Sequence, residues 1–167
     1  MNSTVPIKEL EPPPLRLPRE LVASTAFLLV RLGYAMKGRA IVECERAGFS
    51  PYDHAVLALL GEGERETQGT IADALRLDRS QLVGVLDSLE ERGLIERRRD
   101  PNDRRRHVVS LTAEGKRQLG RERPIFKRLE DEFLAPLDAE SRRTLHTLLL
   151  RLASHHDSRF APGDQRC

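Results

Sequence analysis

The chain has 167 residues, of which 39% are hydrophobic and 32% charged, and a formal net charge of +2, so its composition indicates a globular protein whose overall charge does not point to nucleic acid. No apolar run reaches 18 residues and the N-terminus has no basic start followed by an apolar core, which excludes a predicted membrane span and a secretory signal. Two cysteines, Cys44 and Cys167, form no disulfide framework, and we expect a cytoplasmic protein without a membrane partner.

The positive charge is concentrated in one stretch, residues 97–107, which reads RRRDPNDRRRH. It has six arginines and two aspartates, so it is locally basic on a nearly neutral chain. Taken alone, the stretch fits either a solvated run of charges or a shaped basic element. Its neighbours along the chain decide between these two interpretations.

The N-terminal part is predicted to be a flexible arm followed by a long helix. Residues 1–18 contain a run of three prolines and a further Pro18, which is typical of an extended, partly disordered arm. From Arg19 to about Arg46 apolar residues are dense on more than one face, so the predicted helix must be buried on several sides. We assign residues 19–49 to a dimerisation helix that a partner subunit covers.

Three shorter helices should follow. Ser50-Pro51-Tyr52-Asp53 predicts a helix start with a capping box, and this helix should end at Gly61-Glu62-Gly63. Residues 67–77 and 78–93 then predict two helices with a tight turn between them, which is helix-turn-helix spacing. The second is capped by Asp78, and one face has apolar residues at positions i, i+3, i+4 and i+7, namely Leu82, Val85, Leu86 and Leu89.

The basic stretch lies between two predicted strands, residues 94–97 and 108–112. Asp100-Pro101-Asn102-Asp103 is typical of a turn, because proline fixes φ and Asn and Asp bond to the nearby backbone. The stretch therefore reads as an arginine-rich hairpin directly after a helix-turn-helix. That combination predicts a winged helix-turn-helix over residues 50–112.

Two helices are predicted after the hairpin. One runs from Thr112 to about Leu137 with a kink at Pro124, and the other begins at Asp138. We assign residues 113–157 to C-terminal dimerisation helices and expect residues 158–167 to fray. The predicted fold class is mostly α with a small β-hairpin wing, a winged helix-turn-helix combined with N- and C-terminal helical dimerisation regions.

The candidate DNA-binding residues come from the recognition helix and the wing. The helix face opposite the buried leucines has short or hydrogen-bonding groups that suit a major groove, namely Arg79, Ser80, Gln81, Gly84 and Ser88. Gln81 could instead be the capping partner of Asp78, and Gly84 could be merely tolerated. Asp100 and Asp103 are expected to shape the wing. The wing arginines should reach phosphates or a minor groove, and they are Arg97, Arg98, Arg99, Arg104, Arg105 and Arg106.

Residues 82–115 resemble the signature of the multiple-antibiotic-resistance regulator (MarR) family, and the resemblance extends over about residues 19–155. It is carried by Leu89-Glu90, Gly93-Leu94-Ile95, Asp103-Arg104-Arg105, Leu111-Thr112 and Gly115. The resemblance implies a two-fold dimer that binds palindromic promoter DNA, with ligand or redox signals that change the binding. It also implies that Arg105 enters the minor groove and that Asp103 and Arg104 shape the wing. Gln81, Gly84 and Ser88 depart from the family pattern, which favours indirect readout of the DNA.

No enzyme motif is present, and we expect no catalytic residue, no cofactor and no metal site. His155-His156 is interpreted as a solvated pair at a helix end. Cys44 is interpreted as a partly buried structural thiol, with a redox sensor as the alternative. The family resemblance suggests a phenolic or aromatic acid as effector, and Arg31 (or Lys37), Tyr34 and His54 are its candidate contacts.

The sequence thus predicts a cytoplasmic, homodimeric and sequence-specific transcriptional regulator that binds double-stranded DNA at a palindromic operator. We expect a repressor of its own or neighbouring genes that a small aromatic effector releases. Two alternatives remain open at this point. One is a winged-helix module that binds proteins and has no role on DNA, and the other is a regulator that senses oxidants through cysteine.

Overall fold

The computed structural model describes residues 16–62, 66–99 and 107–160. The chain divides into two compact units, residues 1–36 and residues 37–167, and each is treated by itself. Most of the predicted N-terminal arm therefore lies outside the described residues. So do the turn of the basic hairpin and the last seven residues.

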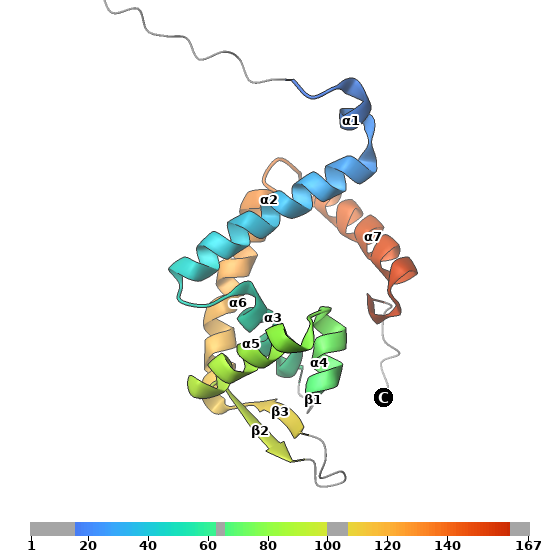
Figure 1. Ribbon diagram of the computed structural model, residues 1–167. Coiled ribbons are helices and arrows are strands. Elements are labelled where there is room, and N and C mark those ends of the chain that lie inside the picture. Colours follow the sequence, from blue (N-terminus) through green and yellow to red (C-terminus); the bar gives the residue numbers. More distant parts are fainter. Residues whose placement is uncertain (1–15, 63–65, 100–106, 161–167) are drawn as a thin grey trace, which may run out of the picture. The chain divides into compact units, whose positions relative to one another are not determined.

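The predicted N-terminal helix is interrupted at Ser24, which separates α1 (Arg19–Ala23) from α2 (Thr25–Arg46), as Figure 1 shows. Ser24 has an extended backbone, and its Oγ accepts a hydrogen bond from the backbone N–H of Phe27 at 3.2 Å. A serine side chain that satisfies a free N–H in this way starts a new helix. The expectation of one unbroken helix from Arg19 was therefore wrong. The boundary between the two units falls within α2.

The predicted helix-turn-helix is confirmed in the second unit. It consists of α4 (Gln68–Leu75) and α5 (Arg79–Glu91) and follows α3 (Pro51–Gly61), and Figure 1 labels all three helices. The capping box of α3 forms in both directions: Ser50 Oγ accepts from the N–H of Asp53, and Asp53 Oδ2 accepts from the N–H of Ser50, both at 3.0 Å. Thr67 caps α4 and Asp78 caps α5.

The two strands predicted on either side of the basic turn are also confirmed, and they belong to a three-stranded antiparallel sheet. Strands β2 (Ile95–Arg99) and β3 (His107–Leu111) pair so that Arg97 lies opposite Val109. A third strand, β1 (Glu66–Thr67), pairs with the other edge of β3 and was not predicted. It has only two residues, too few to show an alternating pattern, yet it ties the start of α4 to the wing.

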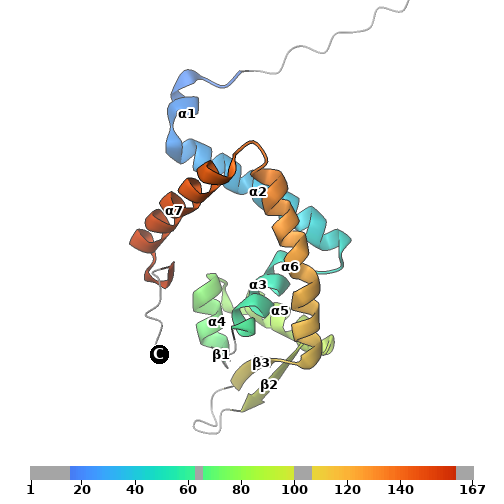
Figure 2. The same cartoon turned by 180° about the vertical axis from the view of Figure 1, so that it is seen from behind.

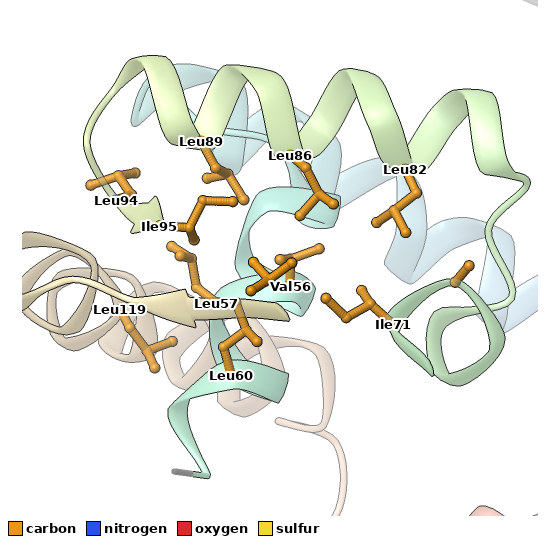
Figure 3. Packing of buried hydrophobic residues seen from close by; sticks show 12 residues of the cluster. Val56, Leu57, Leu60, Ile71, Leu82, Leu86, Leu89, Leu94, Ile95 and Leu119 are labelled. Atoms are coloured by element: carbon orange, nitrogen blue, oxygen red, sulfur yellow. The ribbon is translucent and has the colours of Figure 1, made fainter. Parts of the chain in front are cut away.

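The core of the second unit lies where α3, α4, α5 and the sheet meet, and Figure 3 shows its aliphatic side chains in contact. The predicted inner face of α5 is correct, since Leu82, Leu86 and Leu89 are buried and Val85 is half-buried. The other members come from the remaining elements: Val56, Leu57, Leu60, Ile71, Ala72, Leu94, Ile95, Val109 and Leu119.

The C-terminal region contains α6 (Ala113–Phe133) and α7 (Ala139–His156). Figure 2 shows α6 running from the end of β3 alongside α3. Helix α6 contains Pro124 and ends at Phe133, four residues earlier than predicted, and Asp138 caps α7 as expected. The structure describes no helix that is long and apolar enough to cross a membrane.

The start of α6 lies so close to Leu94, the residue before β2, that only glycine fits at position 115. A Cβ atom added to Gly115 would lie 1.9 Å from the carbonyl oxygen of Leu94. That carbonyl also accepts a hydrogen bond from the N–H of Thr112, the residue that caps α6. This close approach fixes the base of the wing against the first turn of α6.

The residues after α7 do not simply fray, which corrects the expectation for the start of the tail. Ser158–Phe160 form one 3-10 turn, and Ser154 Oγ donates a hydrogen bond to the carbonyl oxygen of Phe160. Asp157, just before the turn, accepts from Arg76 at 3.0 Å and from Arg159. These hydrogen bonds hold the pKa of Asp157 well below its usual range. The turn at the end of α4 and the end of α7 are therefore tied together.

Candidate nucleic-acid interface

The recognition helix α5 presents one polar face to solvent. Its inner face is fixed by the buried leucines, so the remaining positions point away from the core. The structure places every residue predicted for this face among the exposed ones, namely Arg79, Ser80, Gln81, Gly84 and Ser88. Nothing lies within 4 Å of a Cβ atom added at Gly84, so the fold itself does not require glycine there.

The first turn of α5 is organised by Asp78. Its Oδ1 accepts from Ser80 Oγ at 2.6 Å and from the backbone N–H of Gln81 at 2.8 Å. The hydrogen bond from Ser80, followed by that from Gln81, lowers the pKa of the Asp78 carboxyl. The cap therefore uses the Ser80 hydroxyl and the Gln81 backbone. The exposed amide of Gln81 is not needed for capping, which favours its role as a candidate for base contacts.

Arg97 is placed differently from Arg98 and Arg99. Its Nε donates to Glu90 Oε2 at 2.8 Å, and its Nη2 lies 2.7 Å from Asp87 Oδ1 and also contacts Glu90 Oε2. Its side chain is only 22% exposed. The hydrogen bond between the Arg97 guanidinium and the Glu90 carboxylate raises the pKa of Arg97 and lowers the pKa of Glu90. Arg97 thus joins the wing to the recognition helix through two carboxylates of α5.

The next two arginines are exposed. Successive residues of a strand point to opposite faces, so Arg98 points away from the side on which Arg97 meets α5. Arg98 pairs with Glu96 at 2.8 Å, but its side chain remains 71% exposed, and Arg99 is exposed at the end of β2. The remaining predicted wing residues lie outside the described residues: Asp100, Asp103, Arg104, Arg105 and Arg106.

A hollow of about 550 Å³ opens between the start of α4, the start of α5 and the start of β3. Its lining combines hydrogen-bonding groups with Arg79 of the predicted face, and the other lining residues are Thr67, Gln68, Gly69, Thr70, Asp73, Leu82, Val83 and His107. Of these lining residues, the sequence analysis singled out only Arg79 for DNA contact. The start of the first helix of a helix-turn-helix was a usable signal for Gln68 and Thr70, whereas His107 joins them only through the pairing of β1 with β3.

The effector candidates divide between the two units. Arg31 and Tyr34 are exposed residues of α2 in the first unit, and Tyr34 is 71% exposed. His54 belongs to the second unit, where its Nδ1 lies 3.0 Å from Glu122 Oε2 and its ring stacks on Phe126 at 3.9 Å. Glu122 is buried and also accepts from Gln118 Nε2 at 2.9 Å. Glu122 was missed because a glutamate on a charged helix is usually solvated.

Cys44 is completely buried, as a structural thiol should be. Burial, followed by the nearby carboxylates of Glu122, Asp53 and Glu43, raises the pKa of the thiol to about 11. Reactive cysteines show the opposite, a lowered pKa and solvent access. Within the part of the chain that the structure describes, no three His, Cys, Asp or Glu side chains are grouped to hold a metal ion. Cys167 lies outside that part.

A family model described as the MarR family matches residues 49–107, from the residue before the α3 cap to the first residue of β3. A curated relative from Thauera aromatica, a putative transcriptional regulatory protein for the hcr operon, is 36% identical over 105 residues. That alignment covers 63% of this chain and 63% of the relative, so the match spans just under two thirds of the relative's length.

Two solved structures extend the likeness over most of the chain. The PcaV transcriptional regulator from Streptomyces coelicolor, in complex with its natural ligand, is 30% identical with a TM-score of 0.67, covering 85% of this chain and all of that one. The DNA complex of MepR from Staphylococcus aureus is 25% identical with a TM-score of 0.65, covering 79% of this chain and 98% of that one.

Proposed function

This chain belongs to the MarR family, and from that premise we propose that it is a homodimeric, sequence-specific DNA-binding transcriptional regulator. The observation that supports this best is the union of α5 and the wing through Arg97. That contact sets an exposed polar helix face and an exposed basic strand in one fixed arrangement. A rigid pair of this kind suits a major groove and its flanking phosphates. MepR, which this chain resembles, is solved on DNA.

The homodimer is supported by apolar surface that the described chain leaves uncovered. Four leucines of α7 are each between 40% and 50% exposed, namely Leu148, Leu149, Leu150 and Leu152. In the other unit, α2 exposes Leu28, Leu29, Val30 and Leu32. Large apolar side chains that are exposed in such number on one helix favour a protein interface. A two-fold dimer would bind a palindrome whose half-site centres lie roughly 10 bp apart.

We propose further that the protein represses its own or neighbouring genes and that a small aromatic acid releases it. Two observations support the effector: PcaV is solved with a natural ligand, and His54 lies in an aromatic cluster with Phe126 and Phe49. An aromatic ring could join this cluster by stacking. The candidate polar contact of this cluster is His54. Arg31 and Tyr34 stay candidates of the first unit.

The proposal is tested by selecting binding sites from a library of random DNA duplexes with the purified protein. We expect an enriched palindrome with two half-sites about one helical turn apart. Size-exclusion chromatography with light scattering should give two chains per selected duplex. Addition of benzoate and its hydroxylated derivatives should then release the DNA. If no sequence is enriched, the proposal of a sequence-specific regulator is wrong.

A further inference from the structure

One residue of the recognition helix does not fit its polar face. Val83 is 44% exposed, although valine is a residue that proteins usually bury. It lies four residues after Arg79, three after Ser80 and four before Asp87, so these side chains form one stripe along α5. Asp87, at the end of the stripe, contacts Arg97 of the wing. Val83 is therefore the apolar centre of the surface assigned to DNA.

The surroundings of Val83 show which kind of ligand this surface would accept. The hollow beside it is lined by hydrogen-bonding groups at the start of α4, including Gln68 and Thr70, and by Arg79 and His107. Asp73 is the acidic side chain of the lining, and Val83 and Leu82 are its large aliphatic ones. Leu82 is buried in the core, so Val83 supplies the accessible apolar contact. A mainly polar, partly cationic surface with a single exposed apolar side chain does not resemble a protein-docking site, whose core consists of several apolar and aromatic side chains.

The major groove of DNA offers a chemical match. Each base pair presents hydrogen-bonding groups there, and thymine alone adds an apolar group, the C5 methyl. We propose that Val83 is a specificity-determining residue that contacts a thymine methyl group in each half-site. This inference rests on the proposed DNA-binding function. It assigns to this chain a readout of thymine that does not depend on hydrogen bonds from Gln81, Ser80 or Ser88.

The size of the effect follows from the apolar area that is removed from water. Burial of one methyl group changes affinity about fourfold. A dimer with one such contact in each half-site should therefore lose about 15-fold when both methyl groups are absent. Deoxyuridine has the hydrogen-bonding groups of thymidine and lacks only the C5 methyl. Replacement of thymidine by deoxyuridine thus isolates the apolar contact.

The experiment compares the selected palindrome synthesised with thymidine and with deoxyuridine, using fluorescence anisotropy. The wild-type protein should bind the deoxyuridine duplex about 15-fold more weakly. For Val83→Ala, the affinities for the two duplexes should differ less, because the two γ-methyl groups of Val83 are gone and only the Cβ methyl remains for the thymine methyl. Glu62→Ala, at an exposed position in the turn after α3 and in neither the α5 face nor the wing, is the control and should keep the wild-type ratio. The quantity compared among variants is the ratio of the affinities for the thymidine and the deoxyuridine duplex. Any other thymine contact changes this ratio equally in all variants.

The possible results separate the two proposals. Equal wild-type binding to both duplexes would overturn the inference about Val83 and leave the DNA-binding function standing. The same outcome follows if Val83→Ala keeps the full wild-type ratio. If no palindrome can be selected with the wild-type protein, both proposals fail. Because Val83 is exposed, Val83→Ala should melt at the wild-type temperature, and Val83→Thr, which keeps the shape and one methyl group, should give an intermediate ratio.

Discussion

At the scale of single residues, two adjacent arginines of the wing are expected to act differently. Arg97 contacts Glu90 and Asp87 of α5, whereas the side chain of Arg98 is 71% exposed. An arginine that neutralises a phosphate releases a counterion, so its loss lowers the salt dependence of DNA binding by about one unit of the logarithmic slope. An arginine that only positions the wing weakens binding without this change.

We predict that Arg98→Ala lowers the salt slope of DNA binding by about one unit and leaves stability almost unchanged. Arg97→Ala should keep the slope, weaken binding, and lower the free energy of unfolding by about 1 kcal/mol, because Glu90 and Asp87 lose their partner. Anisotropy over a salt series and urea unfolding measure these effects. A lowered slope for Arg97→Ala would show that Arg97 contacts a phosphate.

The Cys44 thiol should be unreactive in the folded protein. With a pKa near 11, about one thiol in ten thousand is ionised at pH 7, and the thiol is also buried. In Cys167→Ser, where Cys44 is the remaining cysteine, iodoacetamide should react slowly in buffer and rapidly in urea. Rapid reaction in buffer would support the alternative of a cysteine-based redox sensor.

The same thiol predicts how stability depends on alkaline pH. Burial raises the pKa of Cys44 from an unfolded value near 9 to about 11, so the folded state binds the proton more tightly. This contribution to stability is complete below pH 9 and is lost as the pH rises toward 11. The free energy of unfolding should therefore fall more steeply over this range in the wild-type protein than in Cys44→Ala. Parallel curves for the two proteins would contradict the assignment.

At the scale of elements, two glycines on the helices that flank the wing should respond in opposite ways to alanine. Gly115→Ala places a Cβ atom 1.9 Å from the Leu94 carbonyl oxygen, so it should lower the free energy of unfolding by about 3 kcal/mol. Gly84→Ala meets nothing within 4 Å and should raise it by about 1 kcal/mol, because alanine favours the helix. Urea unfolding measures both changes.

Gly84→Ala also tests why a glycine occupies the recognition helix. If the backbone at this position approaches DNA closely, the variant should be more stable and yet bind DNA more weakly. Unchanged DNA affinity would show that Gly84 is merely tolerated. The sequence left these two explanations open. The structure does not decide between them, because nothing in the fold lies within 4 Å of a Cβ atom at Gly84.

Elements defined by local signals were predictable from the sequence. Ser50, Asp78 and Asp138 cap the helices that they were predicted to start, because a cap depends on neighbours within three residues. The break at Ser24 carried the same kind of signal but was hidden by the apolar residues around it. Strand β1 depends on pairing with β3, more than 40 residues away, and no local pattern indicates it.

The candidate site was predictable to a lesser degree. The exposed face of α5 follows from the helical period, but the role of Arg97 depends on how far the wing turns back toward Glu90 and Asp87. Likewise, the buried Glu122 becomes a partner of His54 only when α6 packs on α3. Such contacts arise between elements, so neither charge nor spacing along the chain identifies them.

At the scale of the whole molecule, dimerisation and DNA binding should be lost together. Leu148 is 50% exposed on α7, and a glutamate there would place a charge in the proposed subunit interface. Leu148→Glu should sediment as a monomer and lose most of its affinity for the palindrome. Thr147→Glu, which adds the same charge at an exposed polar position, is the control and should remain dimeric. A dimeric Leu148→Glu would exclude α7 from the interface.

The central claim is that α5 and the basic wing form a DNA interface, and fluorescence anisotropy of the wild-type protein over a salt series tests it most directly. The duplex from just upstream of the protein's own gene should bind more tightly than a scrambled duplex of the same composition. Its affinity should fall steeply with salt, as expected for several phosphate contacts. Absence of binding to both duplexes even at low salt would contradict the account.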